Sequence, residues 1–379
     1  MTAYVRRRSY GFGSVYRTAD GRWRGATVVT DPTTGRRSRR TVSGPTAAAT
    51  RDKLDKLRSI AVPTTTMRTA DWLEAWLPTT RLRIAPATFH SYAAGTRAIS
   101  TYIGDVPLGN LTPTDVERMT AAMVAAGNAP STAGNNRKIL RVALRQAIRD
   151  GLAVRNAAAE ARPPRTTPYQ SRTLTAEEAR RLVATTLVDD LGALWTVLVA
   201  TGLRQGEALG LAWRDVDLAA GTLTVRQALA RGWDGRPTLG PPKSDRSRRT
   251  IALPTVARAA LDRQRIQQEA ARAGAGTAWQ DRADLVFTDV VGRPLEGRLV
   301  TPALHVALAR AGLPAIRCHD LRHTAATLQL AAGVPLATIS RTLGHSSIAI
   351  TANIYAAVTP DLRREAADAM DRALNGGAS

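Results

Sequence analysis

The feature that most constrains what this chain can fold into is a proline-rich stretch in its middle, Ala161–Pro168, which reads ARPPRTTP. Proline lacks the amide hydrogen that helices and central strands need, and the stretch has no periodic apolar pattern. It therefore predicts an extended linker between two domains. A second break at Pro63–Thr66 sets off an N-terminal segment. The sequence thus predicts a multidomain protein, with domains at 1–62, 67–160 and 172–379 and a linker at 161–171.

The N-terminal segment is predicted to be a small α+β domain. Turn signals at Asp20-Gly21 and Asp31–Gly35 separate three short runs that suit a β-meander, and residues 46–60 follow with helical spacing. Residues 1–60 hold 14 Lys and Arg against 4 Asp and Glu, a net charge of +10. This excess favours a DNA-binding appendage whose strands face a groove, and the alternative is a structural β-cap with a solvated basic face. The candidate DNA contacts are Arg36, Arg37, Arg39 and Arg40.

Residues 67–160 are predicted to be an all-α domain. Trp72 and Trp76 lie at helical spacing, and Thr112-Pro113 is a typical helix start, since threonine caps free amides and proline fits the first turn. A later helix alternates apolar residues with cations that have few acidic partners, which favours phosphate contact. The alternative is a solvated helix face. The candidate contacts on this helix are Arg137, Lys138, Arg141 and Arg145.

The C-terminal domain is predicted to be mainly α with a small antiparallel β-sheet. Thr175 and Glu178 make a capping box at the first helix, and an apolar helix over 191–200 ends at Gly202, which turns the chain. Lys243 lies on a loop between two predicted strands. The strands are expected at 221–225 and 248–253, and further helices at 254–273 and 300–311.

A net charge of +22 and a pI of about 11.4 imply a polyanionic partner, with nucleic acid as the first candidate. Only 4% of the residues are aromatic, which favours duplex DNA bound through phosphates over stacked single strands. The length and the 44% hydrophobic content argue against a ribosomal-type basic protein. The chain lacks an apolar membrane span and a signal-peptide core, and its one cysteine, Cys318, excludes an intramolecular disulfide. These features predict a cytoplasmic, nucleoid-associated protein.

The residues that can carry chemistry gather near the C-terminus. His319–Thr324 reads HDLRHT, Leu343–Ser347 reads LGHSS, and Tyr355 follows. Arg204, which comes just after the glycine turn, and Lys243 could join them in one cationic pocket. The sequence has neither a glycine-rich nucleotide loop nor the acidic or Cys/His spacing of a metal site. We therefore expect no cofactor and no metal.

Such a pocket suits attack on a phosphodiester by a phenolic oxygen. The pentavalent transition state is more negative than the diester, and Arg204 and Arg322 would pair with its non-bridging oxygens. His345 would donate a further hydrogen bond. His319 would accept or donate a proton near neutral pH.

Lysine can release a proton where arginine cannot, so Lys243 is the candidate acid for the leaving alkoxide, and Tyr355 is the candidate nucleophile. A phosphotyrosine ester is close in energy to the diester it replaces, so the same bond can reseal DNA.

A lone arginine is more often a surface residue and a lone tyrosine more often a core residue, and only their joint occurrence favours a site. His323 and Cys318 are interpreted as structural.

Together, the boxes ATGLRQGE at 200–207, HDLRHT at 319–324 and LGHS at 343–346 and the downstream tyrosine resemble the signature of the tyrosine recombinases, the phage integrase family. The resemblance covers roughly 172–375. It implies the tyrosine recombinase fold. It also implies that Tyr355 attacks while five residues activate the phosphate, namely Arg204, Lys243, His319, Arg322 and His345.

The same resemblance implies that Glu207 supports Arg204, that 67–160 is a core-type DNA-binding domain, and that 1–62 is an arm-type DNA-binding domain of the larger integrases. Two positions differ from the family pattern. Ser244 follows the candidate lysine where threonine is frequent, and Ala357 stands where histidine is frequent.

We therefore expect a site-specific DNA recombinase, an integrase that clamps duplex DNA between its helical and catalytic domains. It would exchange strands through 3′-phosphotyrosyl intermediates and a Holliday junction, integrating or excising a mobile element such as a viral genome. Four strands and one nucleophile per protomer predict a tetramer on DNA, with an accessory directionality or DNA-bending protein as a further partner. The amphipathic segment Asp361–Leu374 would pack on a neighbouring protomer or close its own core.

Two alternatives stay open from the residues alone. A type IB topoisomerase would use similar chemistry as a monomer without site choice. A non-enzymatic DNA-binding regulator would explain the positive charge but not the six candidate catalytic residues.

Overall fold

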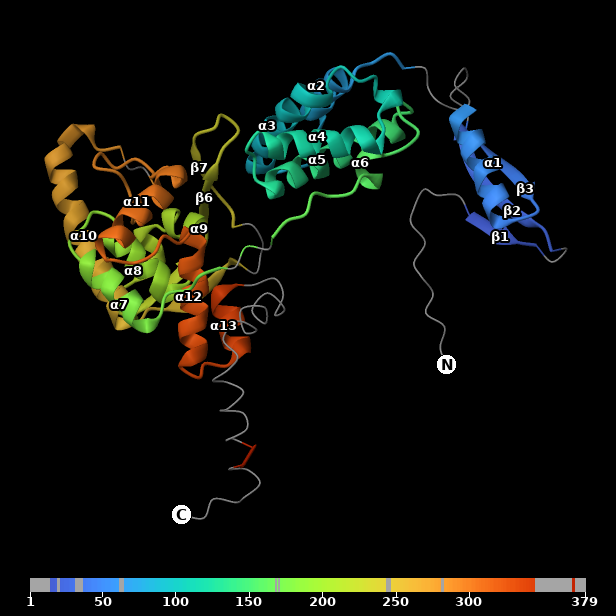
Figure 1. Ribbon diagram of the computed structural model, residues 1–379. Coiled ribbons are helices and arrows are strands. Elements are labelled where there is room, and N and C mark those ends of the chain that lie inside the picture. Colours follow the sequence, from blue (N-terminus) through green and yellow to red (C-terminus); the bar gives the residue numbers. More distant parts are fainter. Residues whose placement is uncertain are drawn as a thin grey trace. The chain divides into compact units, whose positions relative to one another are not determined.

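Two large hydrophobic cores organise the computed structural model of the chain (Figure 1). It describes residues 14–18, 21–30, 37–60, 65–167, 169, 171–242, 247–280, 283–344 and 370–371. The chain divides into two units, Met1–Pro168 and Tyr169–Ser379, so the division falls at the end of the proline-rich stretch. Among the described residues, no helix combines the length and the apolarity that a membrane crossing requires.

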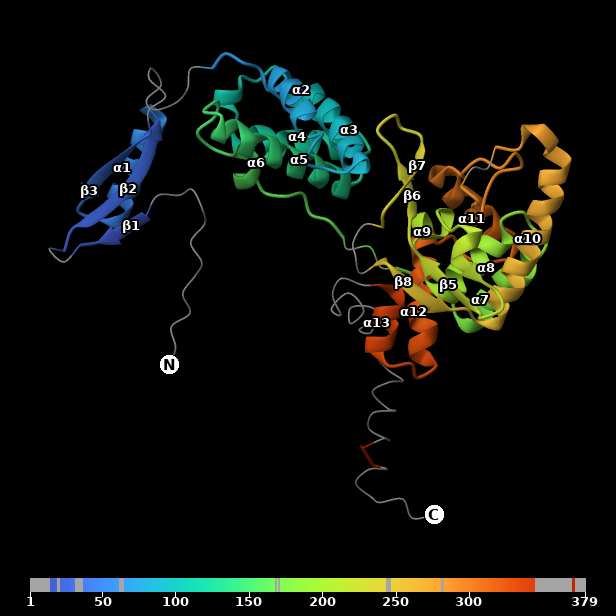
Figure 2. The same cartoon turned by 180° about the vertical axis from the view of Figure 1, so that it is seen from behind.

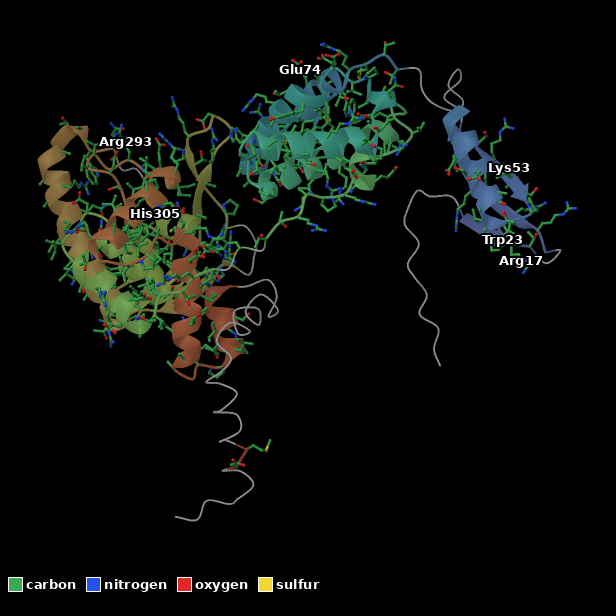
Figure 3. All side chains as sticks on the ribbon, viewed as in Figure 1. Arg17, Trp23, Lys53, Glu74, Arg293 and His305 are labelled. Carbon is green, nitrogen blue, oxygen red and sulfur yellow. The ribbon has the colours of Figure 1, made fainter. Side chains whose placement is uncertain are left out.

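The N-terminal strands form one antiparallel sheet with a helix packed on one face. Gly25 allows that close packing, because a Cβ at this position would come 2.5 Å from Cδ1 of the buried Leu54. Lys53 reaches back from the helix, where its Nζ donates to the carbonyl oxygen of Ser43 at 2.9 Å. Figure 3 labels Lys53 on the helix and Trp23 on the sheet. The sheet order is β1-β2-β3, with β1 Ser14–Arg17, β2 Trp23–Thr30 and β3 Arg37–Gly44, and the helix is α1 Ala47–Ile60.

The rest of the first unit is helical in its described residues, and all six helices given below contribute buried apolar residues to one core. Trp72 is buried there and donates from its indole nitrogen to the carbonyl oxygen of Ala143 at 3.3 Å. Thr112 and Asp115 form a capping box at a helix start, which confirms the start predicted there. The helices are α2 Thr69–Thr79, α3 Pro86–Ile103, η1 Leu108–Asn110, α4 Pro113–Ala125, α5 Pro130–Arg149 and α6 Ala157–Glu160.

The second unit surrounds one apolar helix, α8 Gly192–Thr201, whose residues are almost all buried. Three longer helices and two small antiparallel sheets accompany it, and Figure 2 shows β8 beside α13. The helices are α7 Ala176–Thr185, α9 Gln205–Leu209, η2 Trp213–Asp215, α10 Thr255–Ala275, η4 Gly276–Ala278, α11 Gly297–Arg310, α12 Cys318–Ala331 and α13 Leu336–Leu343. The sheets are β4-β5-β8, with β4 Val216–Asp217, β5 Thr222–Val225 and β8 Arg249–Ala252, and β6-β7, with β6 Ala228–Arg231 and β7 Pro237–Gly240.

The predicted elements differ from the observed ones mainly at their ends. The last long helix before the HDLRHT box begins at Gly297 and not at residue 300. The buried stripe of α5 ends at Ala147, and the apolar Ile148, which follows in the last turn, is 37% exposed. Thr175 and Glu178 form the capping box that their spacing predicts.

Candidate active site

The turn after α8 places Arg204 at the surface of the second unit. Gly202 ends the helix with a φ of +66°, a left-handed conformation that glycine adopts without strain. A Cβ on Gly202 would also collide with the side chain of Leu343. Arg204 follows as the N-cap residue of α9, and its side chain keeps 32% of its surface exposed. The turn therefore leaves one guanidinium within reach of solvent.

Glu207 holds that arginine from one helical turn later. Its side chain is only 3% exposed, and Oε1 accepts from Nη1 of Arg204 at 2.6 Å, while Oε2 accepts from the Arg204 amide at 3.1 Å. Burial alone would raise the pKa of this carboxyl, but hydrogen bonds from Arg249 and Arg204 outweigh burial and lower it. Glu207 is thus a buried anion that fixes the direction of Arg204.

Arg322 lies on α12 and is almost fully enclosed, with 2% of its surface exposed. Its Nη1 donates to the carbonyl oxygen of Gly202 and its Nη2 to that of Leu343, both at 2.7 Å. Nη2 of Arg204 donates to the next carbonyl, that of Gly344, at 2.9 Å. Burial, followed by repulsion from Arg204, lowers the pKa of Arg322 to about 9, which leaves it charged at neutral pH. Two cations therefore converge on the end of α13.

His319 and His323 lie one turn apart on α12 with their rings edge to face, 4.9 Å between centroids. Although His319 keeps part of its surface exposed, burial of the ring, then repulsion from His323 and Arg322, lowers its pKa to about 4. Burial also lowers the pKa of His323. Nδ1 of His323 is buried without a hydrogen-bond partner in the described part of the chain. His319 is therefore neutral at pH 7.

Arg249 also belongs to this cluster, although the sequence predicts only that it lies in the strand expected at 248–253. Its side chain is 7% exposed, and its Nη2 donates to Oε2 of Glu207 at 2.9 Å. Nε donates to the carbonyl oxygen of Thr342 at 2.5 Å, and Nη1 to that of Ser247 at 2.9 Å. The charge-dense run Arg246–Arg249 was the available signal, but it does not show which arginine turns inward.

Asp320 was also passed over, although it lies inside the HDLRHT box. It is fully buried, accepts from the backbone amide, Nε and Nη2 of Arg317, and accepts from the hydroxyl of Tyr169 at 2.9 Å. The Arg317 guanidinium carbon lies 3.4 Å from the centroid of the Tyr169 ring. Burial would raise the pKa of Asp320, but the bonds from Arg317 outweigh it and lower the pKa. This carboxylate fixes the first turn of the helix that carries His319 and Arg322.

Three of the six predicted catalytic residues, Arg204, His319 and Arg322, lie in the described part of the second unit. Lys243, His345 and Tyr355 lie outside the described residues, as do Ser244, Ala357 and most of 361–374. The structure does bring the chain to Gly344, immediately before His345, and the carbonyl oxygen of Gly344 accepts from Arg204. Arg204 and Arg322 are thus joined through one short segment.

The predicted DNA contacts of the first unit fall into different environments. Lys138, Arg141 and Arg145 are exposed along α5. Nη1 of Arg137 instead donates to two backbone carbonyl oxygens, those of Ala158 at 2.5 Å and Ala161 at 3.0 Å. In the N-terminal sheet Arg39 and Arg40 are exposed, the side chain of Arg37 is not described, and Arg36 lies outside the described residues.

Electrostatically, the second unit presents a cluster of three guanidinium groups, Arg204, Arg249 and Arg322, around one buried carboxylate, that of Glu207. The excess positive charge faces solvent through Arg204. A guanidinium offers paired N–H donors that match phosphate oxygens, so this arrangement can bind and polarise a phosphate. No group of three or more His, Cys, Asp or Glu in the described residues is placed to hold a metal ion.

Comparison with known proteins agrees with this geometry. Residues 172–361, about half of the chain, match the model of the phage integrase family. Tyrosine recombinase XerC of Mesorhizobium japonicum is 30% identical over 304 residues, covering 75% of this chain and 90% of that protein. Two solved structures share the fold at 20% identity. The Tn1549 transposon integrase in complex with transposon right end DNA has a TM-score of 0.67, covering 80% of this chain and 99% of that one. A lambda integrase tetramer bound to a Holliday junction has a TM-score of 0.58, covering 92% and 96%.

These matches favour neither the topoisomerase nor the non-enzymatic regulator. The mostly helical fold with small antiparallel sheets is that of the integrase-like tyrosine recombinases. The chain therefore belongs to the phage integrase family and is a tyrosine site-specific recombinase, an integrase that breaks and rejoins DNA.

Proposed function

We propose that this integrase cuts each DNA strand with Tyr355, through a covalent 3′-phosphotyrosyl intermediate. The observation that carries the proposal is the joint attachment of Arg204 and Arg322 to the carbonyls of Leu343 and Gly344. This attachment holds two phosphate-binding cations at the root of the segment that continues through His345 to Tyr355. We therefore expect Tyr355 to come within reach of the two cations when it cuts DNA.

In the proposed cleavage step, the phenolic oxygen of Tyr355 attacks phosphorus and the bond from phosphorus to the 5′ oxygen breaks. His319, neutral at pH 7, accepts the phenolic proton, and Lys243 gives a proton to the departing 5′ oxygen. Arg204, Arg322 and His345 stabilise the pentavalent phosphate. Attack by a 5′ hydroxyl of another strand reverses each transfer, which reseals the DNA and restores the tyrosine.

The first unit supplies DNA affinity in this proposal. Lys138, Arg141 and Arg145 recur at helical spacing along one exposed face of α5, which suits contacts to successive phosphates. We leave Arg137 out of this set, because its guanidinium is bonded to the carbonyls that end α6. Residues 67–160 would then bind core-type DNA sites.

The N-terminal sheet offers a second, arm-type contact. The face of Gly25 is covered by α1, and the strand register places Arg24 and Arg39 on the opposite face, whereas Arg40, paired with Thr27, lies on the covered side. Arg24 and Arg39 are therefore better placed than Arg40 to meet a DNA groove. This face of residues 1–62 would bind DNA away from the site of strand exchange.

Assembly follows from the chemistry, because recombination cuts four strands and each protomer carries one Tyr355. The lambda integrase with the same fold forms a tetramer on a Holliday junction, and we propose the same assembly on DNA here. An accessory protein would set the direction of the reaction, which inserts or removes a mobile element.

The test is a covalent-capture assay with nicked duplexes that tile the DNA flanking the gene. The wild type is expected to form a protein–DNA adduct that survives denaturation, and Tyr355→Phe is expected to form none. Lys243→Ala should slow adduct formation, and a 5′-thiol leaving group, which needs no proton, should restore its rate. An adduct of undiminished yield with Tyr355→Phe would remove Tyr355 from the mechanism. Relaxation of any supercoiled plasmid without site preference would point to topoisomerase activity.

A further inference from the structure

Arg249 belongs to the same cluster, and its side chain is only 7% exposed. Neither the sequence motifs nor the chemistry above gives it a role. It begins β8, and its N–H groups donate to three different parts of the second unit. The first acceptor is the carboxylate of Glu207 in α9, and the second is the carbonyl of Thr342 in the last turn of α13. The third is the carbonyl of Ser247, two residues before Arg249. Arg249 therefore ties together the elements that hold Arg204 and Arg322.

We propose that Arg249 is a positioning residue for the recombination reaction, which holds Arg204 in its phosphate-binding orientation through Glu207 and holds the end of α13 through Thr342. The proposal rests on the function proposed above. In that proposed reaction, Arg249 itself touches no reacting atom. With 7% of its side chain exposed, it is far less accessible than Arg204, at 32%.

The action through Glu207 follows from how the carboxylate divides its bonds. Oε1 binds Nη1 of Arg204, and Oε2 binds Nη2 of Arg249. With Arg249 removed, Oε2 loses its charged partner inside a buried site, where an unpaired anion is strongly unfavourable. The nearest remaining cation is Arg204, so we expect its guanidinium to turn toward both carboxylate oxygens and away from the phosphate.

The action through Thr342 concerns the carbonyls next to it in sequence. Arg322 is held by the carbonyl of Leu343 and Arg204 by that of Gly344, and Arg249 holds that of Thr342. Three consecutive carbonyls thus accept from three arginines. Loss of the bond from Arg249 to Thr342 loosens the end of α13, which holds Arg204 and Arg322. His345 directly follows Gly344, so it would be displaced as well.

The neighbouring Arg248 provides a matched control, because it carries the same charge one position away but is exposed. Arg248→Ala and Arg249→Ala remove equal charge from the same stretch. A general electrostatic role would make the two variants equivalent, whereas a positioning role requires that only the buried arginine affects the chemical step. A loss of DNA affinity alone would appear in the Kd and not in the rate at saturating DNA.

The experiment measures the single-turnover rate of adduct formation at saturating nicked DNA, together with the Kd and the Tm of each variant. Arg249→Ala is expected to slow the rate roughly 100-fold, the usual effect of a misplaced catalytic group, with an unchanged Kd. Arg248→Ala should keep the wild-type rate. Arg249→Lys should also be slow, since the single Nζ of lysine cannot reach the three acceptors that Arg249 meets with three separate nitrogen atoms. This lysine variant carries the test if the alanine variant does not fold.

A double-mutant cycle separates positioning from a merely structural role. If Arg249 acts in part by orienting Arg204, then the combined loss in Arg204→Ala with Arg249→Ala should be smaller than the product of the two single losses, and the remaining loss measures the action through Thr342. Losses that multiply in the double variant, or a wild-type rate in folded Arg249→Lys, would overturn the proposal. Failure of the proposed function looks different, because then the wild type itself forms no adduct or Tyr355→Phe forms one.

Discussion

The arginines of the two units are used in opposite ways. On α5 in the first unit, Arg141 and Arg145, with Lys138, are exposed, and no acidic residue in the described part of the chain pairs with them. In the second unit, Arg322 is buried and the side chain of Arg249 is only 7% exposed, and both guanidinium groups donate to carbonyl or carboxylate oxygens of the protein. The same side chain thus serves long-range attraction in one place and fixed geometry in the other.

The difference has a physical consequence for each region. Exposed cations bind phosphates by displacing counterions, so their effect depends on salt and tolerates small changes in position. Buried cations have given up water, so their orientation is determined by the protein and their loss is felt throughout the cluster. Affinity should therefore depend on α5 and chemistry on the second unit, and substitutions can test that separation.

Arg322→Ala should have the largest effect. It leaves the carbonyls of Gly202 and Leu343 buried without a donor, which costs about 1–3 kcal/mol for each, and it removes one of the two cations proposed to bind the phosphate. The rate of adduct formation at saturating DNA should fall about 100- to 1000-fold, and the Tm should fall as well. Single-turnover cleavage and thermal unfolding measure these two effects. A variant with wild-type cleavage would end the assignment of chemistry to the buried cluster.

The complementary change is the triple substitution of Lys138, Arg141 and Arg145 to alanine. Because these side chains are exposed, the Tm should hardly move, while the slope of log K against log salt concentration should fall by about 3 in magnitude. The rate at saturating DNA should stay at the wild-type value. Binding titrations between 50 and 200 mM salt, about the range in which counterion release is usually measured, give the slope.

Arg137→Ala is the control on the same helix. Its guanidinium is bonded to the carbonyls of Ala158 and Ala161, so its loss should lower the stability of the first unit by about 1–3 kcal/mol and leave the salt slope unchanged. If Arg137→Ala lowers the slope as each exposed cation does, then the distinction between bonded and free cations on α5 is wrong.

These contrasts also show what the sequence can and cannot predict. Capping boxes at Thr112 and Thr175 were predictable, because each joins residues three apart. The glycine turn before Arg204 was predictable for the same local reason. The bonds from Arg322 to Gly202 and from Arg204 to Gly344 join residues 120 and 140 apart in the sequence, so only the packed fold determines them.

The inward turn of Arg249 is the clearest case of information that lies outside the local sequence. Arg248 and Arg249 are the same residue type in adjacent positions, and strand alternation sends one outward and the other inward without saying which. The register of β8 against β5, in which Arg249 pairs with Val225, decides it. The tyrosine recombinase boxes identify the family, and several bonds join one box to another, but Arg249, which binds Glu207, lies outside all of them.

His319 should make stability depend on pH in a defined direction. The unfolded chain protonates this histidine near its ordinary value of about 6.5, whereas the folded ring resists protonation until about pH 4. As the pH falls from 6.5 to 4, the unfolded state therefore gains a proton that the folded state does not, and stability is lost. Thermal unfolding from pH 7 to pH 4 should show a smaller drop for His319→Gln than for the wild type.

Some pH dependence should survive in His319→Gln, because burial also lowers the pKa of His323. The double variant with His323→Gln should have a smaller slope again. Equal slopes for the wild type and both variants would show that the two rings do not share a buried environment, and His319 would then lose its place as a base held neutral by the cluster.

The smallest effect is expected for Tyr169→Phe. This variant tests whether an exposed residue that binds the buried Asp320 contributes to the chemistry. The phenol donates to the buried Asp320, but Tyr169 is 57% exposed and Arg317 alone supplies three further bonds to the same carboxylate. Phenylalanine keeps the ring under the Arg317 guanidinium, so the loss should be below about 1 kcal/mol. Thermal unfolding should detect it, and adduct formation should not. A large loss of cleavage would mean that the segment before α7 orients the helix of His319 and Arg322, and would place an exposed residue in the group that governs the chemistry.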